Sequence, residues 1–138
     1  MTVSEVSFGE YSERMERHPH IYNSVGFAQL NAYMSDGVRC LLFDDNGRVR
    51  FGMILGQRGD RLLSPFSAPF GGFSANRRQS LEKIDEAVSA LSEYAKSERK
   101  DIRIVLPPQF YDSDLTASCI NVLSRRARME YIDLNYYF

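Results

Sequence analysis

One short stretch of the chain concentrates residue types that could bind an anion. Residues 64–78 read SPFSAPFGGFSANRR, with two prolines and three phenylalanines around a Gly-Gly pair. Gly71 and Gly72 allow a ligand to approach the backbone closely, and Arg77 and Arg78 add two positive charges at the expected start of a helix. Unpaired amides at a helix N-terminus favour negative charge as well. The stretch therefore predicts a site for a phosphate or a carboxylate.

A structural interpretation of the same stretch stays open, in which the glycines only form a tight turn and the arginines are solvated. Under the binding hypothesis the phenylalanines form the walls of the pocket. The predicted substrate or anion site then consists of Phe66, Ser67, Phe70, Gly71, Gly72, Phe73, Arg77 and Arg78.

Other residue patterns give weaker indications of chemistry. Ser80 and Lys83 have the spacing of a serine nucleophile and its base, but the companion S-D-N and K-T-G motifs are absent. We interpret them as polar positions in the first turns of a helix. His18 and His20 are too few to form a metal site and have no cysteine or acidic cluster beside them. We therefore predict a flexible segment there, and no metal.

Two tyrosines are weak candidates for a catalytic role. Tyr111 and Tyr136 lie near the carboxyl ends of the last two predicted strands. A tyrosine there could donate a proton or orient a substrate. Packing at the rim of the fold is the commoner role of such residues, so the sequence leaves the general base unidentified.

The composition is that of one ordinary globular domain of 138 residues with a net charge of -1. The chain has no excess of basic residues, so its charge does not indicate a nucleic-acid partner. Cys40 and Cys119 fall inside apolar patterns and are predicted to be buried free thiols. No signal peptide and no apolar run of membrane-spanning length is present. These features predict a cytoplasmic protein.

Hydrophobic periodicity predicts the elements that must position these residues. Helices are predicted at 24–34, after Asn23 or Ser24 as cap, from an Asn76 cap with Gln79 through Ala95, and at about 113–126. The apolar stripes of the two later helices are Leu81, Ile84, Val88, Leu91 and Ala95, and Leu115, Cys119, Val122 and Leu123. In the first of these helices Phe27, Leu30 and Met34 share a face. Strands are predicted at 38–43, 49–55, 61–66, 102–106 and 129–138. Residues 1–20 are expected to be partly mobile.

The order of these elements predicts an α/β (α+β) fold with a mixed sheet. The first three strands follow one another through short turns, so they should be antiparallel. The long helix joins the third strand to the next one in a parallel strand–helix–strand crossover. Helices should cover both faces of the sheet.

This order resembles the fold of GNAT acyltransferases over nearly the whole chain. The first strand of that fold would have to come from residues around 6–11 or from Ile21. The segment LLSPFSAPFGGFSANRRQSLEKIDEAVSALSEYAKSERKDIRIVLPP is similar to the first domain of Fem-type aminoacyl ligases, and SPFSAPFGG is similar to two-domain bacterial GNAT-like proteins. Both resemblances imply that residues 1–138 form one GNAT-like domain, the N-terminal half of a longer tandem protein.

The resemblance implies transfer of an acetyl or aminoacyl group to an amine. A small molecule or a peptidoglycan precursor would be the substrate, and aminoacyl-tRNA is a candidate donor. It also implies a second GNAT-like domain or a homodimer partner along the C-terminal strand. A non-catalytic binding or assembly module with the same fold is the alternative, because a fold does not determine a function.

The chain departs from the GNAT pattern at the cofactor loop. GNAT enzymes hold the pyrophosphate of acetyl-CoA with Q/R-x-x-G-x-G/A, whose backbone amides are the ligands. Here Pro65 and Pro69 remove two amides and the Gly-x-Gly spacing is missing. We therefore predict no particular cofactor, and the sequence argues against acetyl-CoA.

Overall fold

The computed structural model describes residues 1–133 of the chain. The strands are β1 (Thr2–Val6), β2 (Gly37–Asp45), β3 (Arg48–Arg58), β4 (Arg61–Ser64), β5 (Ser74–Ala75) and β6 (Asp101–Ile104). The helices are α1 (Phe8–Arg14), α2 (Val25–Asn31), α3 (Leu81–Glu98) and α4 (Ser113–Arg126), with short 3-10 helices η1 (Ile21–Asn23) and η2 (Ala32–Met34). No helix in this part of the chain is both long and apolar enough to cross a membrane.

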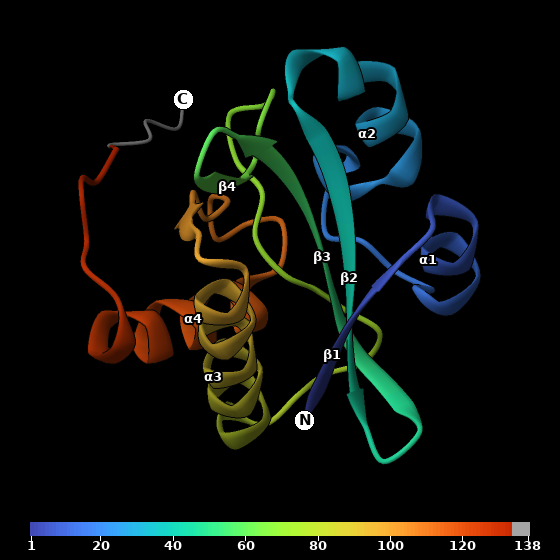
Figure 1. Cartoon of the computed structure of the whole chain (residues 1–138). Coiled ribbons are helices and arrows are strands. Elements are labelled where there is room, and N and C mark those ends of the chain that lie inside the picture. Colours follow the sequence, from blue (N-terminus) through green and yellow to red (C-terminus); the bar gives the residue numbers. More distant parts are fainter. Residues whose placement is uncertain (134–138) are drawn as a thin grey trace.

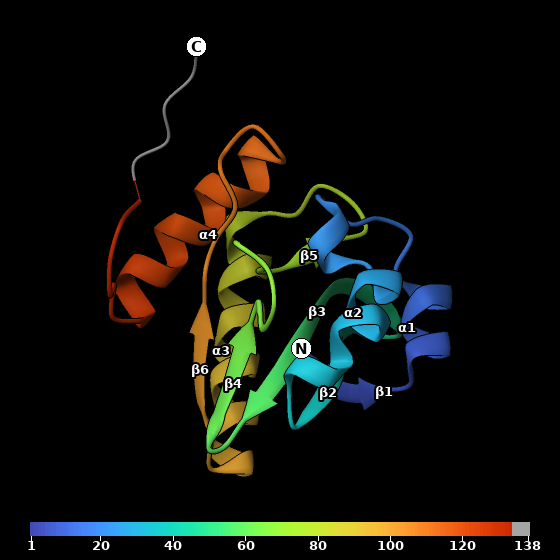
Figure 2. The ribbon, with the colours of Figure 1, turned by 90° about the horizontal axis from the view of Figure 1, so that it is seen from above.

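The sheet is mixed, as the element order predicts. Its strand order is β1-β2-β3-β4-β6, and β5 pairs with β3 outside this path. The pairs from β1 to β4 are antiparallel, whereas β4 and β6 are direct parallel neighbours joined through α3 (Figure 2). An Asn46–Gly47 turn joins β2 to β3, with positive φ at both residues.

Helices cover both faces of the sheet, as the sequence predicts (Figure 1). In β2, Leu41 and Phe43 pack toward α3 and α4, whereas Cys40 and Leu42 pack toward α1 and α2. Side chains of a strand alternate between faces. A strand with both faces covered must therefore be apolar at nearly every position, and β2 and β3 have such continuous runs.

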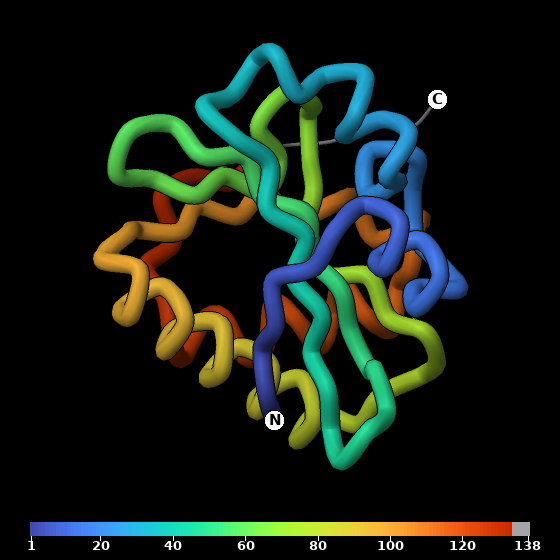
Figure 3. The backbone as a smooth tube through the Cα atoms, turned by 45° about the vertical axis from the view of Figure 1, so that its right-hand side comes forward, coloured from blue at the N-terminus to red at the C-terminus, as the bar shows by residue number. Residues whose placement is uncertain are grey.

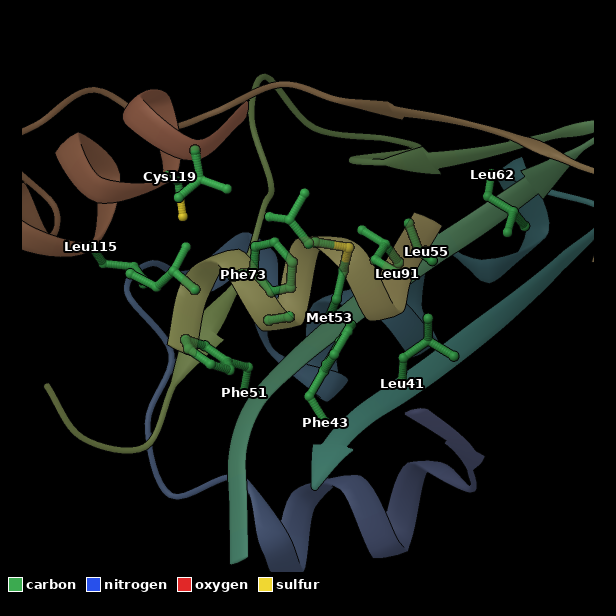
Figure 4. Close-up of a cluster of buried hydrophobic side chains, with 14 residues drawn as sticks. Leu41, Phe43, Phe51, Met53, Leu55, Leu62, Phe73, Leu91, Leu115 and Cys119 are labelled. Atoms are coloured by element: carbon green, nitrogen blue, oxygen red, sulfur yellow. The ribbon is translucent and has the colours of Figure 1, made fainter. Parts of the chain in front are cut away.

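The larger core lies between the sheet and the two C-terminal helices (Figure 4). The predicted stripes of both helices are buried, except that Leu81 at the start of α3 is exposed and Leu123 of α4 is only partly buried. The helix residues in this core are Ile84, Ala87, Val88, Leu91, Leu115, Cys119 and Val122.

The N-terminal prediction was wrong. Residues 1–20 are not a loose segment, because β1 pairs with β2 along its whole length (Figure 3) and α1 buries Tyr11 under the sheet. The first strand is β1 rather than residues around 6–11 or Ile21. Its sequence, TVSEV, has a weak apolar alternation because an edge strand is only half covered.

Helix α3 also starts later than predicted. Ser80 is its N-cap and accepts a hydrogen bond from the Lys83 amide. Asn76 instead accepts a hydrogen bond from the Glu16 amide and donates to the carbonyl of Arg14. Asn76 therefore joins the N-terminal segment to the strand end, a role that no local pattern reveals.

The apolar stripe predicted for the first helix is not buried. Ser24 caps α2 as expected, but Ala28 is its buried residue. Leu30 is 76% exposed, and Met34 in η2 is exposed as well. Because α2 is only two turns long, it buries a narrow strip, and the neighbouring 3-10 turn changes the direction of the later side chains.

The predicted last strand, 129–138, is absent from the part that the structure describes. Residues 127–133 follow α4 without regular secondary structure. Glu130 pairs with Arg103 of β6 at 2.9 Å, and the Arg103 guanidinium lies 5.5 Å from the centre of the Tyr131 ring. Residues 134–138 of this prediction lie outside the described residues.

We predict that Gly56→Ala destabilises the protein by about 2–4 kcal/mol, because a Cβ atom there would overlap the ring of Phe66. Chemical denaturation measures the change. Gly26→Ala in α2 is the matched control, since a Cβ atom meets nothing within 4 Å there. We expect it to be neutral or stabilising by up to about 1 kcal/mol. Equal effects of the two substitutions would contradict the packing argument.

Candidate functional site

The predicted loop leaves the sheet at Ser64 and is bound to the carboxyl ends of β4 and β6. The Val105 amide donates to the Ser64 carbonyl at 2.9 Å, and the Gly71 amide donates to the Val105 carbonyl at 2.8 Å. The Gly72 amide donates to Ser64 Oγ at 2.8 Å. Gly71 therefore takes the position beside the end of β6 that a continued β4 would occupy. Residues 65–70 form a loop outside the sheet between Ser64 and Gly71.

Glycine is required at both positions of the pair. A Cβ atom at Gly71 would come within 2.8 Å of backbone atoms of Ser64 and Pro65, and Gly72 has a φ of +93°. Both amides are bonded inside the protein. They are not available to an anion, so the glycine part of the predicted site has no free donors in this structure.

The segment before α2 covers the loop. His20 is only 6% exposed, and its Nε2 lies 3.1 Å from the Gly71 carbonyl oxygen. Asn23 is also buried and donates to the Gly72 carbonyl at 3.2 Å and to Ser74 Oγ at 3.3 Å. The expectation of a flexible histidine segment was therefore wrong, because these side chains satisfy the carbonyl groups of the Gly-Gly turn.

Aromatic rings surround the His20 imidazole. The ring centres of Phe70, Tyr22 and Tyr111 lie 4.8, 5.7 and 5.7 Å from that of His20. The other two phenylalanines of the predicted pocket are buried on opposite sides of the sheet. Phe66 packs in the smaller core with Tyr11, and Phe73 packs in the larger one (Figure 4).

Ser67 lies elsewhere, beside a very small cavity of about 10 Å³ between the loop and α2. Its hydroxyl is 3.4 Å from Asn31 Oδ1. The structure therefore does not bring the eight predicted residues together in one pocket.

Arg77 and Arg78 do line a pocket, at the N-termini of α3 and α4. Its volume is about 210 Å³. The residues around it are Arg17, Ala75, Arg77, Arg78, Gln79, Ile84, Asp112, Asp114 and Leu115. We call it the arginine pocket. Arg17 is a member that the sequence did not indicate, because it is some sixty positions away in the chain.

Only one of the three arginines in the arginine pocket forms an ion pair within the described residues. Arg78 lies 3.3 Å from Asp114, and Asp112 caps α4 by accepting a hydrogen bond from the Leu115 amide. Within residues 1–133, the guanidinium groups of Arg17 and Arg77 form no ion pair and no hydrogen bond, and the backbone carbonyl of Arg77 accepts one from the Gln79 side chain. Two guanidinium groups are thus free to bind an anion at a place where two helix N-termini meet.

Ser80 and Lys83 have structural roles, as the sequence interpretation held. Ser80 Oγ caps α3. Lys83 donates hydrogen bonds to Glu86 and lies 3.1 Å from Asp45, and these contacts raise the pKa of Lys83. A lysine that acts as a base needs a lowered pKa.

The remaining candidates are placed as follows. Tyr111 is 41% exposed and lies on the connection from β6 to α4, in contact with His20. Tyr136 lies outside the described residues. Cys40 and Cys119 are buried free thiols in different cores, as predicted, and burial raises the pKa of each to about 12. Such thiols are unreactive.

The chain was compared with protein-family models, with curated proteins and with solved structures, and none of the three comparisons found a match. Within residues 1–133 no cluster of three or more metal-binding side chains is present.

The sequence reasoning missed three residues that build this region, namely Arg17, His20 and Asn23. Each lies in the N-terminal segment and acts on residues about fifty to sixty positions later. The only local signal was the polar and aromatic composition of HPHIYN, which does not fit an exposed linker.

We predict that His20 makes the protein less stable in acid. Burial lowers the pKa of the His20 imidazole in the folded state. At pH values between the lowered pKa and the ordinary pKa of about 6.5, the unfolded chain therefore binds more protons than the folded protein does. The free energy of unfolding should therefore rise with pH across that window. Denaturation between pH 5 and 7.5 measures it.

His20→Gln should reduce this pH dependence. His18→Gln, at an exposed position, should change it much less, because the charge of His18 is a smaller cause of the lowered His20 pKa than burial is. The same slope in both variants would show that His20 does not titrate differently in the folded protein.

Proposed function

We propose that this chain is a GNAT-type acyltransferase domain and the substrate-binding half of a Fem-like tandem protein. Its reaction is transfer of an acetyl or aminoacyl group to an amine, and the arginine pocket binds an anionic group of a substrate. The observation that carries this proposal is the pair of unpaired guanidinium groups, Arg17 and Arg77, next to the N-terminus of α3.

The position of the pocket supports a ligand role. In open α/β sheets, ligands bind beyond the carboxyl ends of the strands and against helix N-termini. The arginine pocket lies at such a place, after the strand end and at the start of the crossover helix α3. Ile84 and Leu115 contribute apolar side chains to it, which exclude water from part of the site and strengthen the attraction of the guanidinium groups for an anion.

The chemistry of acyl transfer is compatible with this site. An amine attacks an activated carbonyl carbon, and much of the rate enhancement comes from positioning the two reactants. The protein then needs no serine or cysteine nucleophile, which agrees with the buried, protonated state of both cysteines.

The anionic group is best described as a phosphate or diphosphate. Arginine binds planar or tetrahedral oxyanions through two parallel hydrogen bonds. Acetyl-CoA, a nucleotide-linked peptidoglycan precursor and aminoacyl-tRNA all carry phosphates. Of these, acetyl-CoA has the least support, because the amides of Gly71 and Gly72 are already bonded to Val105 and Ser64.

The same closed loop favours a second candidate, a binding module without catalysis. Gly71 occupies the position beside the end of β6 that a continued β4 would take, and Phe66 and Phe73 are buried in the cores. A module of this kind would bind the anionic ligand in the arginine pocket and leave the reaction to another domain.

We predict that replacing Arg17 and Arg77, the two unpaired arginines of the pocket, by alanine weakens binding of a phosphate ligand about fivefold to tenfold, since partly exposed charge pairs contribute up to about 1 kcal/mol each. The variant should also flatten the dependence of affinity on salt. Calorimetric titration with pyrophosphate, acetyl-CoA and a UDP-linked muropeptide measures both effects.

Arg128→Ala is the matched control. Arg128 is exposed and follows the C-terminal end of α4, about 20 Å of helix away from the pocket. It should leave affinity unchanged. If none of the three ligands binds, or if the control weakens binding as much as the double variant does, the anion-site proposal is wrong. Binding without acyl transfer would favour the non-catalytic module.

A further inference from the structure

The hydrogen bond of His20 determines which of its nitrogens carries the proton. A carbonyl oxygen can only accept, so Nε2 must donate its hydrogen to Gly71. In the neutral imidazole, Nδ1 then has a free lone pair and is a hydrogen-bond acceptor. Burial lowers the pKa of His20 and so favours this neutral form.

Nδ1 of His20 is buried and has no hydrogen-bond partner within residues 1–133. A buried acceptor without a donor costs about 1–3 kcal/mol, and native proteins leave few of them. The partner that Nδ1 lacks must be a donor, either a water molecule or a group of a ligand.

The surroundings of His20 favour a positively charged donor. Three aromatic rings, those of Tyr22, Phe70 and Tyr111, lie with their centres 4.8–5.7 Å from the imidazole centre. Aromatic faces attract cations, and an ammonium group carries N–H donors as well as charge. The rings and Nδ1 together match the two properties of an ammonium ion.

One ring of this cluster is exposed to solvent. Tyr111 is the exposed ring of the three and belongs to the connection between β6 and α4, at the carboxyl end of β6. Movement of this ring is the route by which we expect a ligand to reach the buried Nδ1. Tyr22 and Phe70 are half-buried, and their ring centres lie 5.1 Å apart, so these two rings form the fixed part of the site.

We infer that His20 Nδ1 and the rings of Tyr22, Phe70 and Tyr111 bind a primary ammonium group, with Nδ1 accepting one of its N–H hydrogens. The identity of this group as the amine acceptor of an acyl transfer rests on the proposed function. The binding itself does not, because it needs neither an acyl donor nor the arginine pocket.

A titration followed by NMR tests this inference on the whole chain with ¹⁵N-labelled histidine. The probes are propylammonium, 1-propanol, which has a donor without charge, and tetramethylammonium, which has charge without a donor. Propylammonium should bind saturably and shift the Nδ1 resonance of His20, and each of the other two probes should bind at least about fivefold more weakly.

His20→Gln keeps a donor for the Gly71 carbonyl and removes the acceptor at the Nδ1 position, so it should weaken propylammonium binding about tenfold. His18→Gln is the matched control and should have no effect. Tyr111→Leu, at an exposed ring, should weaken binding about twofold to fivefold. This variant tests the site even if His20→Gln does not fold.

Three results would overturn the inference. The first is the absence of a saturable shift with propylammonium, which would mean that a bound water is the partner of Nδ1. The second is binding of tetramethylammonium or propanol as strong as that of propylammonium. The third is a loss of propylammonium binding in His18→Gln as large as the loss in His20→Gln. The Arg17→Ala and Arg77→Ala double variant should bind propylammonium normally. Failure of the phosphate titration and failure of this one are therefore distinguishable.

Discussion

The hydrogen bonds of Ser64 are the constraint on which the functional region depends. Its carbonyl joins β4 to β6 through Val105, and its hydroxyl holds the amide of Gly72. The chain must leave the sheet after Ser64, because Pro65 has no amide to continue the ladder. After residues 65–70 the chain returns to the sheet at Gly71, whose amide bonds to the Val105 carbonyl. The length and shape of the excursion follow from these two fixed ends.

This closure has consequences for both proposed sites. The carbonyl groups of Gly71 and Gly72 point to His20 and Asn23, which fixes the N-terminal segment over the loop and positions the imidazole among the rings. The chain then continues through β5 to the arginines before α3. In the chain, Phe70 of the aromatic cluster precedes β5 and the two arginines follow it.

The N-terminal segment links the two regions more than its sequence indicates. Between α1 and η1 it contributes Arg17 to the arginine pocket and His20 to the aromatic cluster. Asn76 fixes the start of this segment through Glu16 and Arg14. The arginine pocket and the aromatic cluster therefore share one short segment of chain, which Asn76 fixes at its start.

The sequence by itself determined the mixed sheet, the crossover and the approximate positions of α3 and α4. Continuous apolar runs between short turns mark strands that are covered on both faces, and a period of 3.6 residues marks a helix that is buried on one face. It also located the Gly-Gly loop at the strand end, where close approach excludes side chains. The tertiary structure alone decided what the loop bonds to. Whether an amide is free for a ligand or is taken by Ser64 and Val105, and whether His20 is exposed or buried, depends on contacts between residues some fifty positions apart. No local pattern records such contacts, because each partner is compatible with many structures until the fold brings them together.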